Sequence, residues 1–135
     1  MKKTTRDYIE AELRDYHKTL GEIANLKEDL LNESPLPPDG MPRGSTKSDP
    51  TFQRTVKLIT CRQLGYMCRV SEGIAAALDS LPPEKMALVK LKYWTKPQTL
   101  TDIGMSIKLN CHRNTFYLWR NEVCEEIAKQ LGIPV

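Results

Sequence analysis

Arg113 and Asn114 have the side chains best suited to specific hydrogen bonding in this chain. An arginine can donate to both major-groove acceptors of guanine, and an asparagine can bond both groups of adenine. Tyr117 could stack on a base or touch a thymine methyl, although an amphipathic surface tyrosine is an equally good interpretation. Together with Leu118, these residues would read DNA bases if one helix presents them on an open face.

The residues before this group fit the first helix of a helix-turn-helix. Met105 and Leu109 form an apolar pair four residues apart, which places both on one face of a helix. Ser106 is the small residue at the point where a second helix would cross the first. We therefore expect a short helix here that packs under the base-reading helix.

The turn between the two helices needs a residue that tolerates positive φ, then an apolar residue, then an N-cap. Asn110, Cys111 and His112 occupy these positions, with histidine a weak substitute for the usual Ser or Thr. Beyond them an apolar stripe recurs at spacings of 3, 4, 4 and 4: Phe116, Trp119, Val123, Ile127 and Leu131. A plain helical hairpin would show the same spacing, so the outward side chains carry the DNA hypothesis.

The charges limit how far such a helix can enter a groove. Lys96, Lys108 and Arg120 are, with Arg113, the cations best placed to contact phosphates. Glutamates at 122, 125 and 126 would be repelled, so only the first part of the helix should enter. Four phosphate contacts at about −0.9 each give a salt slope near −4, which is modest for a single module. We therefore expect a homo-oligomer that binds adjacent half-sites.

Length and composition favour a small helical protein. The 135 residues are 40% hydrophobic and 27% charged, enough for one modest core or a small domain with an extended element. Residues 81–135 carry eight Lys/Arg against five Asp/Glu, whereas residues 1–34 carry six against eight. No apolar run of membrane-spanning length occurs, and the first residues lack the apolar segment of a signal peptide. These features predict a protein of the cytoplasm with no membrane partner.

The four cysteines predict neither disulfides nor a metal. Cys61, Cys68, Cys111 and Cys124 form no CxxC pair, and their spacings of 7, 43 and 13 resemble no zinc-binding pattern. A phosphate-binding loop and paired histidines are also lacking. The sequence therefore predicts no metal, no cofactor, no small-molecule substrate and no enzymatic activity.

Residues 1–33 predict a long N-terminal helix with a heptad-like pattern. Its apolar positions are Ile9, Leu13, Tyr16, Leu20, Ile23 and Leu30, with Lys27 in the remaining seam position. Few breakers interrupt this segment, so one helix of about 30 residues is expected, kinked near Gly21. The seam could pack on another helix of the chain or pair with a second copy. The pattern leaves both possibilities open.

Three more units follow this helix. Residues 34–50 hold five prolines and two glycines and predict a linker, and residues 51–80 predict a long connecting helix. Its apolar stripe shifts phase around residues 63–66, as expected of a helix that meets one partner with its first half and another with its second. Residues 81–135 form the proposed DNA-binding domain. They start with a helix from Pro83 to Trp94 that should turn Met86, Val89 and Tyr93 inward and Lys85, Lys90 and Lys92 outward.

The C-terminal third resembles region four of bacterial sigma factors, in which a short helix precedes a helix-turn-helix. The whole chain resembles RinA-type phage activators of late genes. The residues that carry this resemblance are LVKLKYWTKPQTLT at 88–101, Arg113, Thr115, YLWRNEV at 117–123 and the IAKQLG ending. Asn110 and His112 depart from the usual pattern at the turn and cap.

The resemblance implies an all-α fold and assigns base reading to Arg113, Asn114, Tyr117 and Leu118. It also implies a transcriptional activator of phage structural and packaging genes that binds double-stranded DNA with host RNA polymerase as partner, inside the bacterial cytoplasm. A small DNA-binding subunit of a phage packaging motor, or a helical protein-interaction module, are the alternatives. A chain truncated before Pro50 is expected to remain a folded, monomeric reader.

Overall fold

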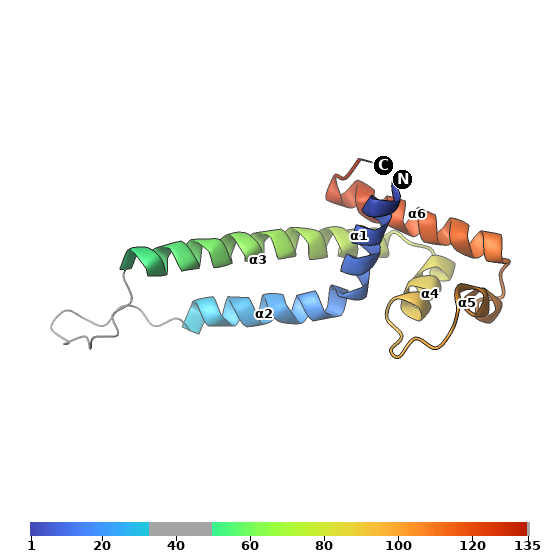
Figure 1. Ribbon diagram of the computed structural model, residues 1–135, viewed down its shortest axis with the longest axis horizontal. Helices are drawn as coiled ribbons and strands as arrows, with labels where there is room; N and C mark the ends of the chain where they lie inside the picture. Colours follow the sequence, from blue (N-terminus) through green and yellow to red (C-terminus); the bar gives the residue numbers. More distant parts are fainter. Residues whose placement is uncertain (33–49, 135) are drawn as a thin grey trace.

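The computed structural model describes residues 1–32 and 50–134, and within these residues every regular element is an α-helix. This confirms the all-α prediction, while most of the predicted 34–50 linker lies outside the described residues. In the described part of the chain no helix is long and apolar enough to cross a membrane. The helices (Figure 1) are α1 (Lys3–Arg14), α2 (Tyr16–Asn32), α3 (Pro50–Asp79), α4 (Pro83–Lys92), α5 (Asp102–Lys108) and α6 (Arg113–Leu131).

The prediction of a single N-terminal helix is wrong, because the chain turns at Asp15. This residue has φ −91° and ψ 6°, and α1 and α2 leave it in different directions (Figure 1). Gly21, the expected kink, lies within α2. The reason is tertiary: Ile9 and Leu13 on α1 are fully buried in the C-terminal half of the molecule, whereas α2 lies along α3.

α2 and the first half of α3 form an antiparallel helical hairpin that projects from the rest of the molecule (Figure 1). The N-terminal seam therefore packs on a helix of its own chain. Ile23 is buried in this contact, and Leu26 and Leu30 are half-buried. Leu20, predicted to lie in the seam, is instead 40% exposed. We refer to α2 together with residues 54–69 of α3 as the arm.

The second half of α3 joins α1, α4, α5 and α6 in a globular head, as the phase shift in its apolar stripe predicts. Where α3 crosses α6, a Cβ added at Gly73 would lie only 2.5 Å from Cδ2 of Leu131, so a side chain at this position would displace the Leu131 side chain. The buried apolar core of the head comprises Ile9, Leu13, Val70, Ile74, Ala77, Leu88, Val89, Tyr93, Met105, Phe116, Val123, Cys124, Ile127 and Ala128. Because α1 supplies two of these residues, the expectation that the chain folds from Pro50 onward on its own conflicts with the structure.

α4 differs in detail from its predicted form. It ends at Lys92, and Leu88, which the pattern did not assign inward, is fully buried. Lys85 and Lys92 were expected to point outward, but each is half-buried by an ion pair. Lys85 pairs with Glu122, and Lys92 lies 2.8 Å from Asp102 on α5. These pairs fix α4 against the two helices that follow it.

The corner between α1 and α2 is held by Trp94, two residues beyond the end of α4. The indole Nε1 of Trp94 donates a hydrogen bond to the carbonyl of Leu13 at 3.0 Å. Its ring stacks with Tyr16 at 6.0 Å between centroids and lies 4.5 Å from the ring of His17. The direction of the arm is therefore fixed by contacts with the head.

Candidate nucleic-acid interface

The turn between α5 and α6 has the backbone geometry that its residue types predict. Asn110 has φ 57°, in the left-handed region that asparagine tolerates better than most residues. Its N–H donates to the carbonyl of Ile107, and the N–H of Cys111 donates to that of Ser106, both at 3.0 Å. These bonds satisfy carbonyls at the end of α5 and start the chain toward α6.

His112 is the N-cap of α6, as predicted. Its backbone is extended, with φ −71° and ψ 150°, and its Nδ1 accepts a hydrogen bond from the N–H of Asn114 at 3.1 Å. An imidazole nitrogen accepts only when it carries no proton, so this cap requires the neutral ring with its hydrogen on Nε2. Thr101 caps α5 in the same manner, accepting from Gly104 at 3.1 Å.

The inward stripe packs as the spacing predicts. Met105 and Ser106 on α5 are 3% and 2% exposed, which allows α6 to cross closely over them. The Ser106 hydroxyl donates to the carbonyl of Ile103 at 2.6 Å, so this buried polar group is satisfied. Phe116 and Val123 are fully buried, whereas Trp119 is only half-buried against the core. The spacing of α5 and α6 is thus fixed by apolar packing.

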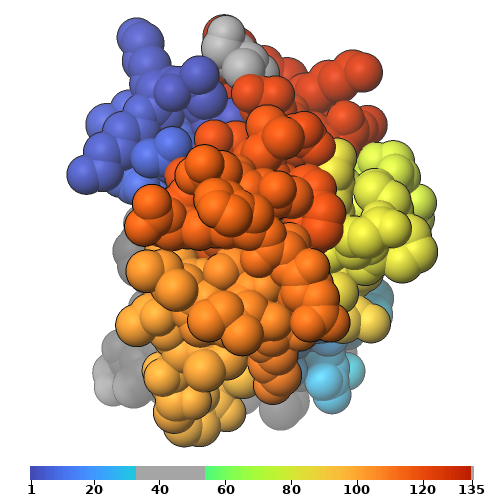
Figure 2. All heavy atoms as spheres, turned by 90° about the vertical axis from the view of Figure 1, so that its right-hand side faces the viewer, coloured from blue at the N-terminus to red at the C-terminus, as the bar shows by residue number. Residues whose placement is uncertain are grey.

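Three of the four predicted base-reading residues are exposed on α6. Arg113 and Asn114 lie in its first turn, and Leu118 is 55% exposed one turn later. Tyr117 differs: it is half-buried, with its ring centroid 5.9 Å from that of Phe116 in an edge-to-face contact. Figure 2 shows that the first half of α6, α5 and the segment before it share one face of the head.

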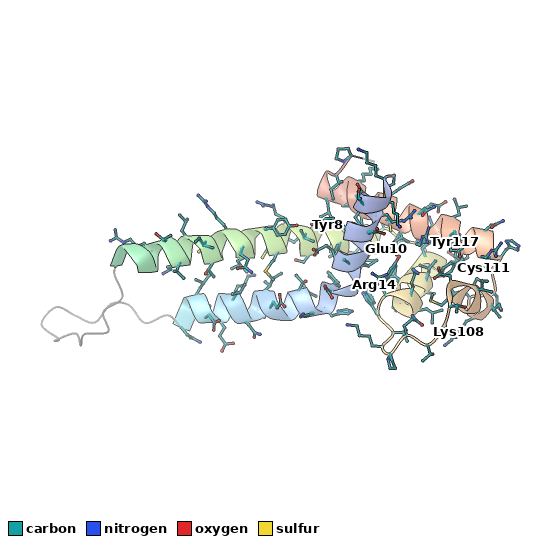
Figure 3. All side chains as sticks on the ribbon, in the orientation of Figure 1. Tyr8, Glu10, Arg14, Lys108, Cys111 and Tyr117 are labelled. Atoms are coloured by element: carbon teal, nitrogen blue, oxygen red, sulfur yellow. The ribbon has the colours of Figure 1, made fainter. Side chains whose placement is uncertain are left out.

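Arg120, predicted to contact phosphate, is held by its own chain. Its guanidinium lies 5.0 Å from the ring centroid of Tyr117 and donates to the Asn121 side chain at 3.2 Å. Its Nε is buried and has no hydrogen-bond partner among the described residues. Arg120 therefore helps to hold Tyr117 in place, and this leaves Lys96 and Lys108 as the exposed cations of the predicted set (Figure 3 labels Lys108).

Arg14 is a cation near this face that the sequence did not reveal. It comes from the end of α1, and its side chain is 52% exposed. With Lys96, Gln98 and Thr101 it lines a cavity of 380 Å³ between α1 and the segment that leads into α5. More than eighty residues separate Arg14 from Lys96, so no local pattern could have indicated that they lie together.

A polar cluster joins α1 to Tyr93 at the end of α4 and stabilises the head. The Tyr93 hydroxyl donates to Glu10 at 2.9 Å, and Arg6 and Arg14 flank the same carboxylate at 3.8 and 3.9 Å. Burial, and next the neighbouring Cys124 and Glu10, raises the pKa of Tyr93 well above its usual range. Burial and the Glu10 charge raise the pKa of Cys124 to about 11, so its thiol stays protonated and a poor nucleophile.

The chemistry available at this face is recognition by hydrogen bonds, charge and apolar contact. Within the described residues no group of three or more His, Cys, Asp or Glu side chains could hold a metal ion. Comparison of the chain with family models, with curated proteins and with solved structures gives no match.

Proposed function

We propose that this protein is a sequence-specific DNA-binding regulator that reads the major groove with the start of α6. The observation that carries this proposal is the α5-turn-α6 unit, with its left-handed Asn110 and an α6 whose first turns expose Arg113, Asn114 and Leu118. Recognition helices of helix-turn-helix proteins contact base edges mainly through their N-terminal residues. The unit therefore serves as a helix-turn-helix.

In this proposal each exposed side chain has its own part. Arg113 donates to guanine and Asn114 bonds adenine, and each such bidentate pair contributes about 1–3 kcal/mol of discrimination. Leu118 offers an apolar surface to thymine methyl groups. Tyr117 supports α6 through Phe116 and takes a smaller part in reading, because its ring is half-buried.

The phosphate contacts come from three segments that flank α6. Lys108 ends α5, Lys96 lies in the segment before α5, and Arg14 reaches the cavity edge from α1. Because Arg113 is assigned to a base, these three cations make about three phosphate contacts, which corresponds to a salt slope of about −3 at about −0.9 each. Arg14 takes the place of Arg120 in this set because its side chain is 52% exposed, although it also flanks Glu10 and lies over the Tyr93 ring, whereas Arg120 is half-buried with an enclosed Nε.

The resemblance to RinA-type regulators makes transcription activation the specific role that we propose, at phage late genes with host RNA polymerase. The α4-α5-α6 order, a short helix followed by the two-helix unit, is consistent with region four of sigma factors. Ile103 and Ile107 on α5 are 50% and 69% exposed one turn apart, and they offer an apolar contact beside the DNA face. Such a pair suits a protein partner better than a phosphate backbone.

The test is footprinting on phage DNA upstream of late operons, comparing the wild type with Arg113→Ala. Losing the guanine contact should weaken binding by about 1–3 kcal/mol at one base position and relax specificity there. Arg113 is exposed, so helix content and thermal stability should not change. Lys129→Ala, which removes a charge from the exposed last turn of α6, serves as the matched control. Binding with no sequence preference, or an unchanged preference in Arg113→Ala, would contradict the assignment.

A further inference from the structure

The arm lies at the opposite end of the long axis of the molecule from α5 and the start of α6 (Figure 1). A duplex bound at the reading face would therefore leave the arm pointing away from the DNA. Several large apolar side chains of the arm are open to solvent: Leu20, Leu31, Val56, Leu58 and Ile59 are 40% to 85% exposed. Leu20 and Leu31 share one face of α2, and exposed apolar groups that lie together indicate a contact surface.

One face of the arm gathers small and apolar residues. The arm seam follows Thr19, Ile23, Leu26 and Leu30 on α2, and Thr60, Leu64 and Met67 on α3. The residues one position after these form a second stripe on each helix. In an antiparallel pair, stripes displaced in the same sense on both helices fall on the same side. This second stripe, here called the arm face, consists of Leu20, Ala24, Lys27, Leu31, Cys61, Gly65 and Cys68.

The opposite side of the arm has a different character. On α2 it carries Lys18, Glu22, Asn25 and Asp29, which are all exposed. On α3 it carries Ile59, Gln63 and Tyr66. The Tyr66 hydroxyl forms a hydrogen bond with that of Tyr8, so α1 crosses this side near the head (Figure 3). Among the seven residues of the arm face only Lys27 is charged, and the same side of α3 continues to Lys57 and Arg54 toward the start of the helix. The arm face lies on the side away from α1. The arm is therefore amphipathic, with its apolar side uncovered in a single chain.

The dimensions of the arm face fit a second copy of the chain. The 17 residues of α2 span about 25 Å, and two helices side by side are about 20 Å wide, which gives a face of about 500 Å². Two such faces in contact bury on the order of 1,000–1,500 Å² of accessible surface in total, because projecting side chains add to the flat area. This area is at the lower end of stable interfaces. The small side chains at Ala24, Cys61 and Gly65 permit close helix approach, and no atom lies within 4 Å of a Cβ built at Gly65.

We propose that the arm faces of two chains pack against each other about a two-fold axis to form a four-helix bundle, with a reading head on each chain. A two-fold axis lets the same patch serve on both chains and separates the two Lys27 charges when the arms run antiparallel. The purpose of this dimer, tighter binding to DNA, rests on the proposed function, because two heads make twice the phosphate contacts of one. The packing itself depends only on the arm.

The test is the mass of the full-length protein by light scattering at several concentrations. We expect twice the 15.4 kDa mass of one chain, and a double variant Leu20→Glu/Leu31→Glu should restore the mass of one chain with unchanged helix content. Asn25→Glu places the same charge on the opposite side of α2 and should leave the dimer intact. Maleimide labelling of Cys61, located by peptide mapping, should be slow in the wild type and fast in the double variant, since this thiol is exposed in a single chain.

A wild-type protein with the mass of one chain at all concentrations would overturn the proposal. So would a monomer that gains mass only when RNA polymerase is added, because the arm face would then belong to that partner. Equal loss of the dimer in Asn25→Glu would also exclude the arm face as the contact. A dimer without DNA sequence preference would refute the proposed function alone, and a monomer with clear preference would refute the dimer alone.

Discussion

A substitution at Leu13 tests whether α1 forms part of the core of the proposed reading head. The side chain is fully buried, although it lies about one hundred residues before the proposed base-reading residues of α6. Truncating a buried leucine to alanine costs about 2–5 kcal/mol, and the well-filled site around Leu13 favours the upper half of that range. Leu118→Ala makes the same chemical change at a side chain that is 55% exposed and lies outside the proposed dimer contact, and without DNA it should change stability by no more than about 0.5 kcal/mol.

Removing all of α1 extends this reasoning. The deletion loses two fully buried side chains, Ile9 and Leu13, each contributing about 1.5–3 kcal/mol. It also leaves the buried hydroxyl of Tyr93 without Glu10, which costs about 1–3 kcal/mol. The sum, about 4–9 kcal/mol, is comparable to the whole stability of a small domain, about 5–15 kcal/mol. A chain that lacks α1 should therefore not hold a folded head.

Urea unfolding followed by circular dichroism at one fixed protein concentration measures both effects. Leu13→Ala should shift the midpoint strongly without changing the slope, and Leu118→Ala should unfold with the wild type. The deletion should show no cooperative transition. A cooperative, fully folded protein after removal of residues 1–15, or equal midpoints for the two alanine variants, would refute the placement of α1 in the head core.

Arg14→Ala should make the dependence of log affinity on log salt less steep by about 0.9. The control Lys18→Ala, on the exposed side of α2, should leave this dependence unchanged. An unaltered slope in both variants would remove Arg14 from the proposed DNA face. Asn110→Ala should destabilise the protein by about 1 kcal/mol because alanine disfavours positive φ, and Asn110→Gly should not; equal losses in thermal unfolding would point to the side chain instead of the backbone. Burial and the charge of Glu10 raise the pKa of Cys124 from 9.0 to about 11 in the folded state. The stability linked to this thiol is therefore present below pH 9 and is lost as the pH rises toward 11. Cys124→Ala should flatten part of that fall, and an identical pH profile would contradict this origin.

The α5-α6 unit could be predicted closely because its geometry is set by neighbours in sequence. Asn110 sets the turn through its own φ, and His112 caps α6 through a bond to a residue two positions away. Met105 and Phe116 lie on apolar faces that the helical period alone defines. Whether such a unit binds DNA depends on the outward side chains, and for these the sequence and the structure agree on exposure at Arg113 and Asn114.

The features that escaped prediction depend on contacts between different elements, or, for Arg120, on a contact within α6. The sequence pattern predicts Lys92 to be exposed, but its ammonium lies 2.8 Å from the carboxylate of Asp102 on α5. Arg120 has the spacing of a phosphate contact, but the ring of Tyr117 and the Asn121 amide hold it. Arg14 lies beside the proposed DNA face only because α1 packs against the other helices of the head. In each case the residue fits the helical pattern of exposed charges, but a contact that this pattern does not show determines whether its side chain is free or held.

The corner at Asp15 shows why one apolar pattern can yield two helices with different tasks. Ile9 and Leu13 complete the head core, whereas Ile23 and Leu30 face α3 in the arm, and a straight helix could not satisfy both sets. Trp94 holds the corner by donating to the carbonyl of Leu13 and stacking on the first ring of α2. The proposed dimer contact on the arm is therefore coupled by direct packing to the proposed reading head, because α1, which leads directly into α2 of the arm, also closes the core beneath α6.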